Sequence, residues 1–170
     1  MEDRAVARLQ ELTRAKADPD PKALACYGLL VRHFQPPVEQ MQLRFVAGRP
    51  VSAVTIDFLA WCCARLAEHG MTALLLIWDN ASWHTSQAVR AWLRTHNQQV
   101  KASQRGVRIV ACWLPVKSPW LNPIEPKWVH GKRAVSDPDR LLSAAELEER
   151  VCRYYACPAE AHLLMPKKVA

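Results

Sequence analysis

The chain has 170 residues, half of them hydrophobic and 23% charged, a composition that fits one globular domain with a sizeable core. Lys and Arg number 23 against 16 Asp and Glu, and the net charge of +7 favours a polyanionic partner. No apolar run approaches membrane-spanning length and the charged N-terminus lacks a signal-peptide core, so we expect a cytoplasmic protein without a membrane partner. The six cysteines form no C-x-x-C pair and are expected to be reduced thiols.

The first part of the chain predicts an arm followed by two strands and a helix. Residues 1–21 are expected to form an arm or linker, because Asp18-Pro19-Asp20-Pro21 interrupts their weak helical periodicity. The continuous apolar run from Ala23 to Val31 predicts a buried strand, and the alternation from Gln40 to Val46 predicts a half-buried one. A helix is expected from Ser52 to Glu68, with the hydroxyl of its first residue as the N-cap.

The remaining elements alternate between strands and helices. They are a central strand at Ala73 to Asp79, a helix at Ser86 to His96, a polar basic loop at Asn97 to Gly106 and a buried strand at Val107 to Leu114. Pro123 is expected to start a further helix, and Ser143 with Glu146 forms a capping box for the last one. This order predicts an α/β fold, a mixed sheet with helices packed on it. Ligands of such sheets collect at the carboxyl ends of strands.

Two acids, Asp79 and Glu125, stand apart from the other charged residues. Asn80 to Ile124 contains no Asp or Glu, where about four are expected at the average frequency of the chain. Divalent hard cations bind carboxylate oxygens together with substrate phosphate, and two such ions can support an in-line displacement at phosphorus. The structural alternative is that Asp79 caps the next helix and that Glu125 pairs with Lys127 or Lys132.

Two phrases resemble a known family. "IWDNASWH" (Ile77 to His84) and "LPVKSPWLNPIEPKW" (Leu114 to Trp128) resemble the motifs of DDE-type transposases of the insertion-sequence 630 group, relatives of the mariner elements. The resemblance covers Ala23 to Val135 and implies a ribonuclease-H-like fold, a mixed five-stranded sheet flanked by helices. The implied division is an arm at 1–21, a partial catalytic domain at 22–135, and a C-terminal helix and tail at 136–170.

The same resemblance implies metal-dependent DNA strand cleavage and strand transfer, with the element ends and the target DNA as partners. Asp79 is implied as the second and Glu125 as the third ligand of a two-ion site for Mg²⁺ or Mn²⁺. Asn80 and His84 match motif positions whose roles stay open between contacting DNA and orienting the aspartate. The turn that aims Glu125 matches the motif at Pro115, Ser118, Pro119, Asn122 and Pro123.

Basic and aromatic residues surround the second phrase. The candidate phosphate contacts are Lys117, Lys127, Lys132 and Arg133, and a solvated basic face is the alternative. Trp120 and Trp128 are expected to pack rather than to stack on bases.

The resemblance also requires a first aspartate on a central first strand, and the sequence offers no credible candidate. None of the early acids ends an apolar run: Glu2, Asp3, Glu11, Asp18 and Asp20. We therefore expect the central strand to be absent, the two-ion site to be incomplete and the chain alone to be inactive. It would be a split-frame product or a decayed remnant of a transposase, expected by likeness to form homo-oligomers. The alternatives are a non-catalytic basic nucleic-acid-binding module and a subunit complemented by an upstream polypeptide.

Overall fold

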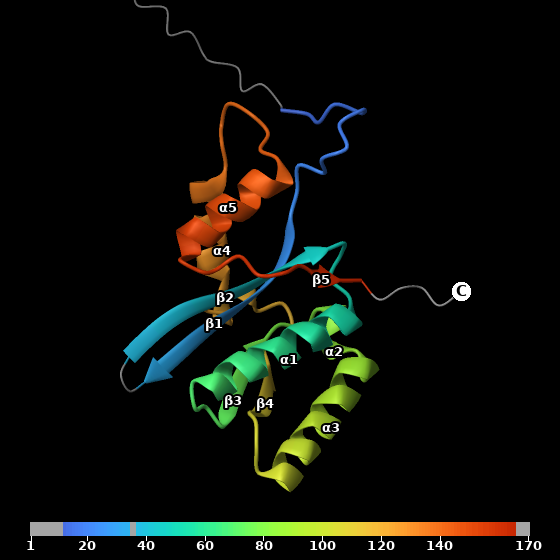
Figure 1. The fold of residues 1–170 in the computed structure, drawn as a ribbon, viewed down its shortest axis with the longest axis vertical. Coiled ribbons are helices and arrows are strands. Elements are labelled where there is room, and N and C mark those ends of the chain that lie inside the picture. The colour runs from blue at the N-terminus through green and yellow to red at the C-terminus, as the bar shows by residue number, and fades with distance from the viewer. Residues whose placement is uncertain (1–11, 35–36, 166–170) are drawn as a thin grey trace, which may run out of the picture.

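The computed structural model describes residues 12–34 and 37–165 as a mixed α/β fold (Figure 1). Its elements are β1 (Ala25–Phe34), β2 (Pro37–Ala47), α1 (Ser52–Glu68), β3 (Ala73–Trp78), α2 (Ser82–Thr85), α3 (Gln87–Ser103), β4 (Arg108–Trp113), the 3₁₀ turn η1 (Pro119–Leu121), α4 (Glu125–Val135), α5 (Ala144–Tyr155) and β5 (Leu163–Leu164). No helix in this described part of the chain combines the length and apolarity needed to cross a membrane.

The strands form two sheets, where the sequence predicted one. β1 and β2 pair antiparallel over their whole length and β5 adds to β2 in parallel, whereas β3 and β4 form a separate parallel pair. The single sheet is not continuous because, among the described residues, no strand lies between β1 and β3. The alternation predicted for β2 is confirmed, since Met41, Leu43 and Phe45 are buried. The predicted burial of β1 is wrong for most of the strand, because from Ala25 to His33 only Tyr27 and Val31 are buried. The burial predicted for the strand at Val107 to Leu114 is also wrong, since only Ile109 is buried in β4, and β3 is not central among the described strands because it pairs with β4 alone.

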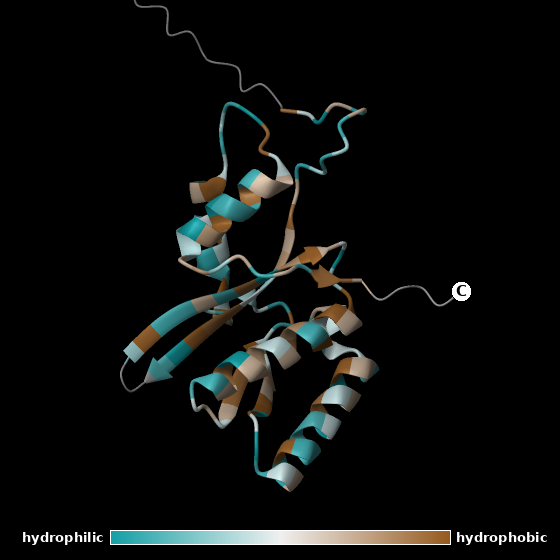
Figure 2. Ribbon diagram, in the orientation of Figure 1, coloured by the Kyte–Doolittle hydropathy of each residue, from teal (hydrophilic) through white to brown (hydrophobic). Residues whose placement is uncertain are grey.

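Helix α1 packs against both sheets. Phe58 and Cys62 lie in a cluster with Tyr27 and Val46 of the first sheet, whereas Leu59 lies in the cluster that contains the core of β3 and β4. Apolar bands alternate with polar ones along α1 and α3 (Figure 2), as amphipathic helices require. The predicted Ser52 cap is wrong: Val51 is the N-cap residue and provides no side-chain hydrogen bond.

Helix α3 is longer than predicted, because it continues through most of the segment expected to be a loop. Ser86 caps it by accepting a hydrogen bond from the Val89 amide, and it ends at Ser103. Its last turns are fixed to β4 by Asn97, whose amide group donates to the Ile109 carbonyl and accepts from the Ile109 N–H, each at 2.8 Å. These polar bonds to an adjacent strand stabilise the end of α3, which the hydrophobic periodicity of the sequence does not reveal.

Helices α4 and α5 cover the opposite face of β1 and β2 from α1 (Figure 1). A Cβ added to Gly28 would lie 2.5 Å from Trp128, so the glycine lets α4 approach β1 closely. Trp128 in turn meets Tyr155 of α5 edge-on at 5.8 Å. The α5 capping box of Ser143 and Glu146 is confirmed. Pro123 does not start α4, which begins at Glu125.

Candidate functional site

Asp79 directly follows β3, and the end of that strand is fixed by a contact to the next strand. The Leu114 N–H donates to the Trp78 carbonyl at 2.9 Å, which continues the β3–β4 ladder by one step. The Asn80 side chain then donates to the Leu114 carbonyl at 2.5 Å. Asn80 therefore ties the ends of the two parallel strands together and holds Asp79 at their carboxyl edge.

The Asp79 carboxylate is oriented by its own loop. Its Oδ1 accepts from the Ala81 N–H at 3.1 Å and lies 2.6 Å from Nδ1 of His84. The His84 ring stacks on Trp78, with ring centroids 4.9 Å apart and an angle of 19° between the planes. Both hydrogen bonds involve Oδ1, so within the described residues Oδ2 stays available. Asp79 forms an Asx turn, and the alternative of a helix cap is wrong, because Ala81 and Ser86 are the N-caps of α2 and α3.

Glu125 is positioned by a compact turn after β4. The Leu121 N–H donates to the Ser118 carbonyl at 3.1 Å, and the Glu125 N–H donates to the Asn122 carbonyl at 3.1 Å. Asn122 is buried, which anchors the turn under the first residue of α4. A carboxylate in the first turn of a helix is favoured by the helix dipole.

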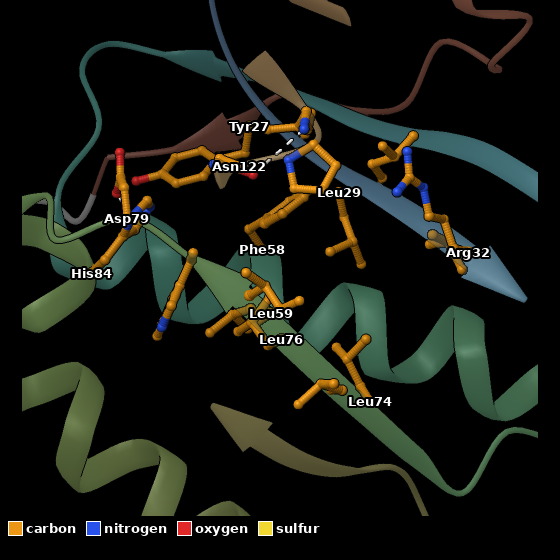
Figure 3. Close-up of a pocket in the computed structure, with 18 of the residues that line it drawn as sticks. Tyr27, Leu29, Arg32, Phe58, Leu59, Leu74, Leu76, Asp79, His84 and Asn122 are labelled. Carbon is orange, nitrogen blue, oxygen red and sulfur yellow. Dashed lines mark hydrogen bonds and ion pairs between the residues drawn. The ribbon is translucent and has the colours of Figure 1, made fainter. Parts of the chain in front are cut away.

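One cleft of about 800 Å³ opens between β1 and β3 (Figure 3). Asp79 and Glu125 both line it, although 45 residues separate them in the sequence. His84 and Asn122 line it as well. Asn80 does not line the cleft, and its side chain instead bonds the Leu114 carbonyl at the end of β4. The lining of the cleft thus includes two carboxylates, an imidazole and an amide.

The candidate phosphate contacts fall into two groups. Lys127 forms an ion pair with Glu39 of β2, and Lys127 followed by Arg32 lowers the pKa of that glutamate. The other three are exposed: Lys117, Lys132 and Arg133. In the described part of the chain Glu125 forms no ion pair with Lys127 or Lys132, so that structural alternative does not hold.

The two tryptophans of the second phrase have different environments. Trp128 packs between Gly28 and Tyr155, as predicted. The packing predicted for Trp120 is wrong, because its side chain is 73% exposed on η1. The sequence interpretation also missed Trp78, whose ring stacks on His84, although Trp78 directly precedes Asp79 in the first phrase.

The carboxylates supply only part of a metal site. Within residues 12–34 and 37–165, no three His, Cys, Asp or Glu side chains are grouped so that they could hold an ion. Asp79 and Glu125 nevertheless provide oxygen donors, the chemistry that Mg²⁺ and Mn²⁺ prefer.

The fold and the cleft define a mixed α/β domain with a carboxylate site at the carboxyl end of a parallel strand pair. Residues 44–148 match a family model described as DDE superfamily endonuclease, and the chain belongs to this family. Membership implies transposase-like nucleic-acid processing, a nuclease or transferase reaction on DNA, and the divalent metals that the family typically uses. No curated protein and no solved structure matches the chain.

Proposed function

We propose that the chain supplies the second and third metal ligands of a DDE-type transposase of the insertion-sequence 630 group. The phrases "IWDNASWH" and "LPVKSPWLNPIEPKW" support this group within the wider family. The proposed fold is ribonuclease-H-like without its central strand. The order of α1, β3, α3 and β4, with β1 and β2 before them, supports that assignment. The division into an arm at 1–21, a catalytic part at 22–135 and a C-terminal part at 136–170 is also a proposal.

The observation that carries the proposal is that Asp79 and Glu125 line the same cleft. Asp79 presents Oδ2, while His84 and the Ala81 N–H fix its other oxygen. Glu125 presents its carboxylate from the first turn of α4, where a rigid turn holds the backbone. When Mg²⁺ or Mn²⁺ is bound, it stabilises the charge that develops on the phosphodiester and activates the attacking oxygen. Among the described residues no third acid joins these two, so we expect that the chain alone does not cleave or join DNA.

A metal titration tests the site without requiring activity. We expect weak Mn²⁺ binding to the purified chain, detected by electron paramagnetic resonance, and its loss in both Asp79→Asn and Glu125→Gln. Glu149→Gln is the matched control, because that carboxylate is exposed and paired with Arg153 on α5. Unchanged Mn²⁺ binding in both site variants would show that the two carboxylates do not share an ion.

An activity assay tests the expected inactivity. The chain is incubated with DNA carrying the element ends, in Mg²⁺ or Mn²⁺, and nicked and joined products are separated on a denaturing gel. No product above background is expected. Robust cleavage that Asp79→Ala abolishes would mean that the acids present suffice.

A second candidate function is a non-catalytic nucleic-acid-binding module. The net charge of +7 and the exposed side chains of Lys117, Trp120, Lys132 and Arg133 favour it. Affinity for DNA would then fall steeply with salt, ignore Mg²⁺ and survive Glu125→Gln. In the transposase proposal, Mg²⁺ strengthens binding of the wild-type chain and not of the glutamine variant. Homo-oligomers are a further part of that proposal, checked by analytical ultracentrifugation.

A further inference from the structure

A second, smaller groove lies between α3 and β4, which are side by side (Figure 1). Its volume is about 230 Å³, and it shares no lining residue with the cleft that contains Asp79. The buried side chains of Leu93 and Ile109 give it an apolar floor. Arg90 and Arg94, both exposed, also line it. The groove is open to solvent rather than enclosed, so a polymer can pass through it.

No carboxylate balances the two arginines of this groove. Every residue that lines it comes from the stretch between Asn80 and Ile124, which contains no Asp or Glu. In the part of the chain that the structure describes, neither arginine forms an ion pair. Arg90 and Arg94 are four positions apart on α3, and like charges at that spacing repel each other. An anion bound between them would relieve this repulsion.

Arg90 is held in place by a stack of aromatic rings. Its guanidinium carbon lies 5.5 Å from the centroid of the Trp113 ring. Trp113 in turn packs against the buried Trp78, with ring centroids 5.9 Å apart. A guanidinium on an aromatic face keeps the N–H groups at its edge available, and its planar fork can donate two bonds to one phosphate group. Arg90 is therefore oriented before any ligand binds.

The free edge of β4 adds a backbone donor to the groove. The N–H groups of Arg108 and Leu114 donate towards β3, so the even-numbered positions face that strand. The odd-numbered positions face α3, as the bond from the Ile109 N–H to Asn97 shows. Ala111 is the next odd-numbered position and lines the groove. Among the described residues no strand pairs with this edge, so the Ala111 N–H has no partner in a sheet.

We propose that the groove between α3 and β4 binds the phosphodiester backbone of DNA, with Arg90 and Arg94 on phosphate oxygens and the Ala111 N–H as a third donor. These contacts address the backbone alone, so binding does not depend on base sequence. The choice of DNA as the polyanion follows from family membership. The groove itself requires neither a metal ion nor the two carboxylates of the cleft, and it therefore goes beyond the proposed function.

The salt dependence of DNA binding tests the two arginines. Fluorescence anisotropy with a short labelled duplex of arbitrary sequence, in EDTA, gives the slope of log affinity against log salt concentration. The slope should fall by about 0.9 in Arg90→Gln and in Arg94→Gln, and by about 1.8 in the double variant. Arg90→Lys keeps the charge and should keep the slope.

Arg153→Gln is the matched control for net charge. Arg153 is exposed on a different helix, α5, and is paired with Glu149. This variant loses the same formal charge as each groove variant and should leave the slope unchanged. An equal fall in all three glutamine variants would reduce the effect to net charge and overturn the proposal. Unchanged slopes in both groove variants would overturn it as well.

Nuclear magnetic resonance determines where the DNA lies. On adding the same duplex, the Ala111 amide signal and the Nε–H signals of Arg90 and Arg94 should shift. The Val110 amide, which faces β3, is the neighbouring control and should shift less. Shifts confined to other surfaces would overturn the proposal. Inorganic phosphate at the same phosphate concentration should cause little change, and equal shifts would show a site for single anions instead of a DNA backbone.

Folding and the carboxylate site are checked separately. Circular dichroism and thermal melting establish that the variants are folded, and the removal of one of two repelling charges should not lower the melting temperature. If Mn²⁺ does not bind at the two carboxylates but the arginine variants lose salt slope, the proposed function fails and the groove stands. If Mn²⁺ binds there and the arginine variants behave like Arg153→Gln, the groove fails and the proposed function stands.

Discussion

Gly28→Ala tests whether the close contact between β1 and α4, the helix that begins at Glu125, stabilises the fold. The added Cβ would lie 2.5 Å from Cζ2 and 2.6 Å from Cη2 of Trp128, both shorter than van der Waals contact. Trp128 cannot withdraw freely, because Tyr155 meets it edge-on and is itself fixed by donating to the Lys127 carbonyl at 2.7 Å. Overpacking of this kind costs about 1–3 kcal/mol of unfolding free energy. For a chain of this size the melting temperature should fall by roughly 2–12 °C.

A double-mutant cycle measures the clash itself. Urea unfolding followed by circular dichroism gives the unfolding free energies of wild type, Gly28→Ala, Trp128→Phe and the double variant. Phenylalanine lacks the ring atoms that would collide, so the alanine should cost at least 1 kcal/mol less in the Trp128→Phe background. Additive effects, or a loss below about 0.5 kcal/mol for Gly28→Ala alone, would refute the contact argument.

Three further predictions concern other parts of the chain. Asn97→Ala removes both side-chain hydrogen bonds to Ile109, so the unfolding free energy should fall by about 1–3 kcal/mol and amides at the end of α3 should exchange faster with solvent. Unchanged exchange would contradict a role of Asn97 in fixing α3 to β4. The pKa of Glu146 is lowered from 4.5 to about 2 by Arg140 and then by the Ser143 cap, so the stabilisation that the charged carboxylate provides is present above pH 4.5 and lost towards pH 2. Urea unfolding at a series of pH values should show that Glu146→Gln loses less unfolding free energy than wild type between pH 4.5 and pH 2. Parallel curves for the two proteins would exclude this contribution. Lys132→Ala and Arg133→Ala should each reduce the salt slope of DNA binding by about 0.9, whereas Lys127→Ala, whose partner is Glu39, should leave it unchanged; three equal slopes would refute the distinction.

Local patterns predicted the elements that depend on local chemistry. The alternation of Met41, Leu43 and Phe45 determined the face of β2, and the Ser143–Glu146 pair determined the start of α5. The end of α3 was missed because it depends on Asn97 reaching a strand 12 residues further along the chain. The start of α4 was misplaced at Pro123, because either Pro123 or Pro126 fits the first turn of a helix.

The candidate site was predictable as a set of residue types but not as a set of contacts. The isolated acids and the two phrases identified Asp79 and Glu125, which line one cleft. The pairing of Lys127 with Glu39 brings together residues of α4 and β2, and sequence spacing carries no information about that contact. Trp120 is likewise exposed on η1, which its residue type alone does not predict.

Helix α1 joins the two sheets through the packing of its side chains. Phe58 and Leu59 are neighbours in sequence, yet one packs toward β1 and the other toward β3, because successive helical positions point about 100° apart. Each buried apolar side chain of this kind stabilises its sheet by about 1.5–3 kcal/mol, and in the described residues no backbone hydrogen bond joins the sheets. In the described residues the two sheets are therefore joined by the packing of α1 side chains and not by a strand ladder.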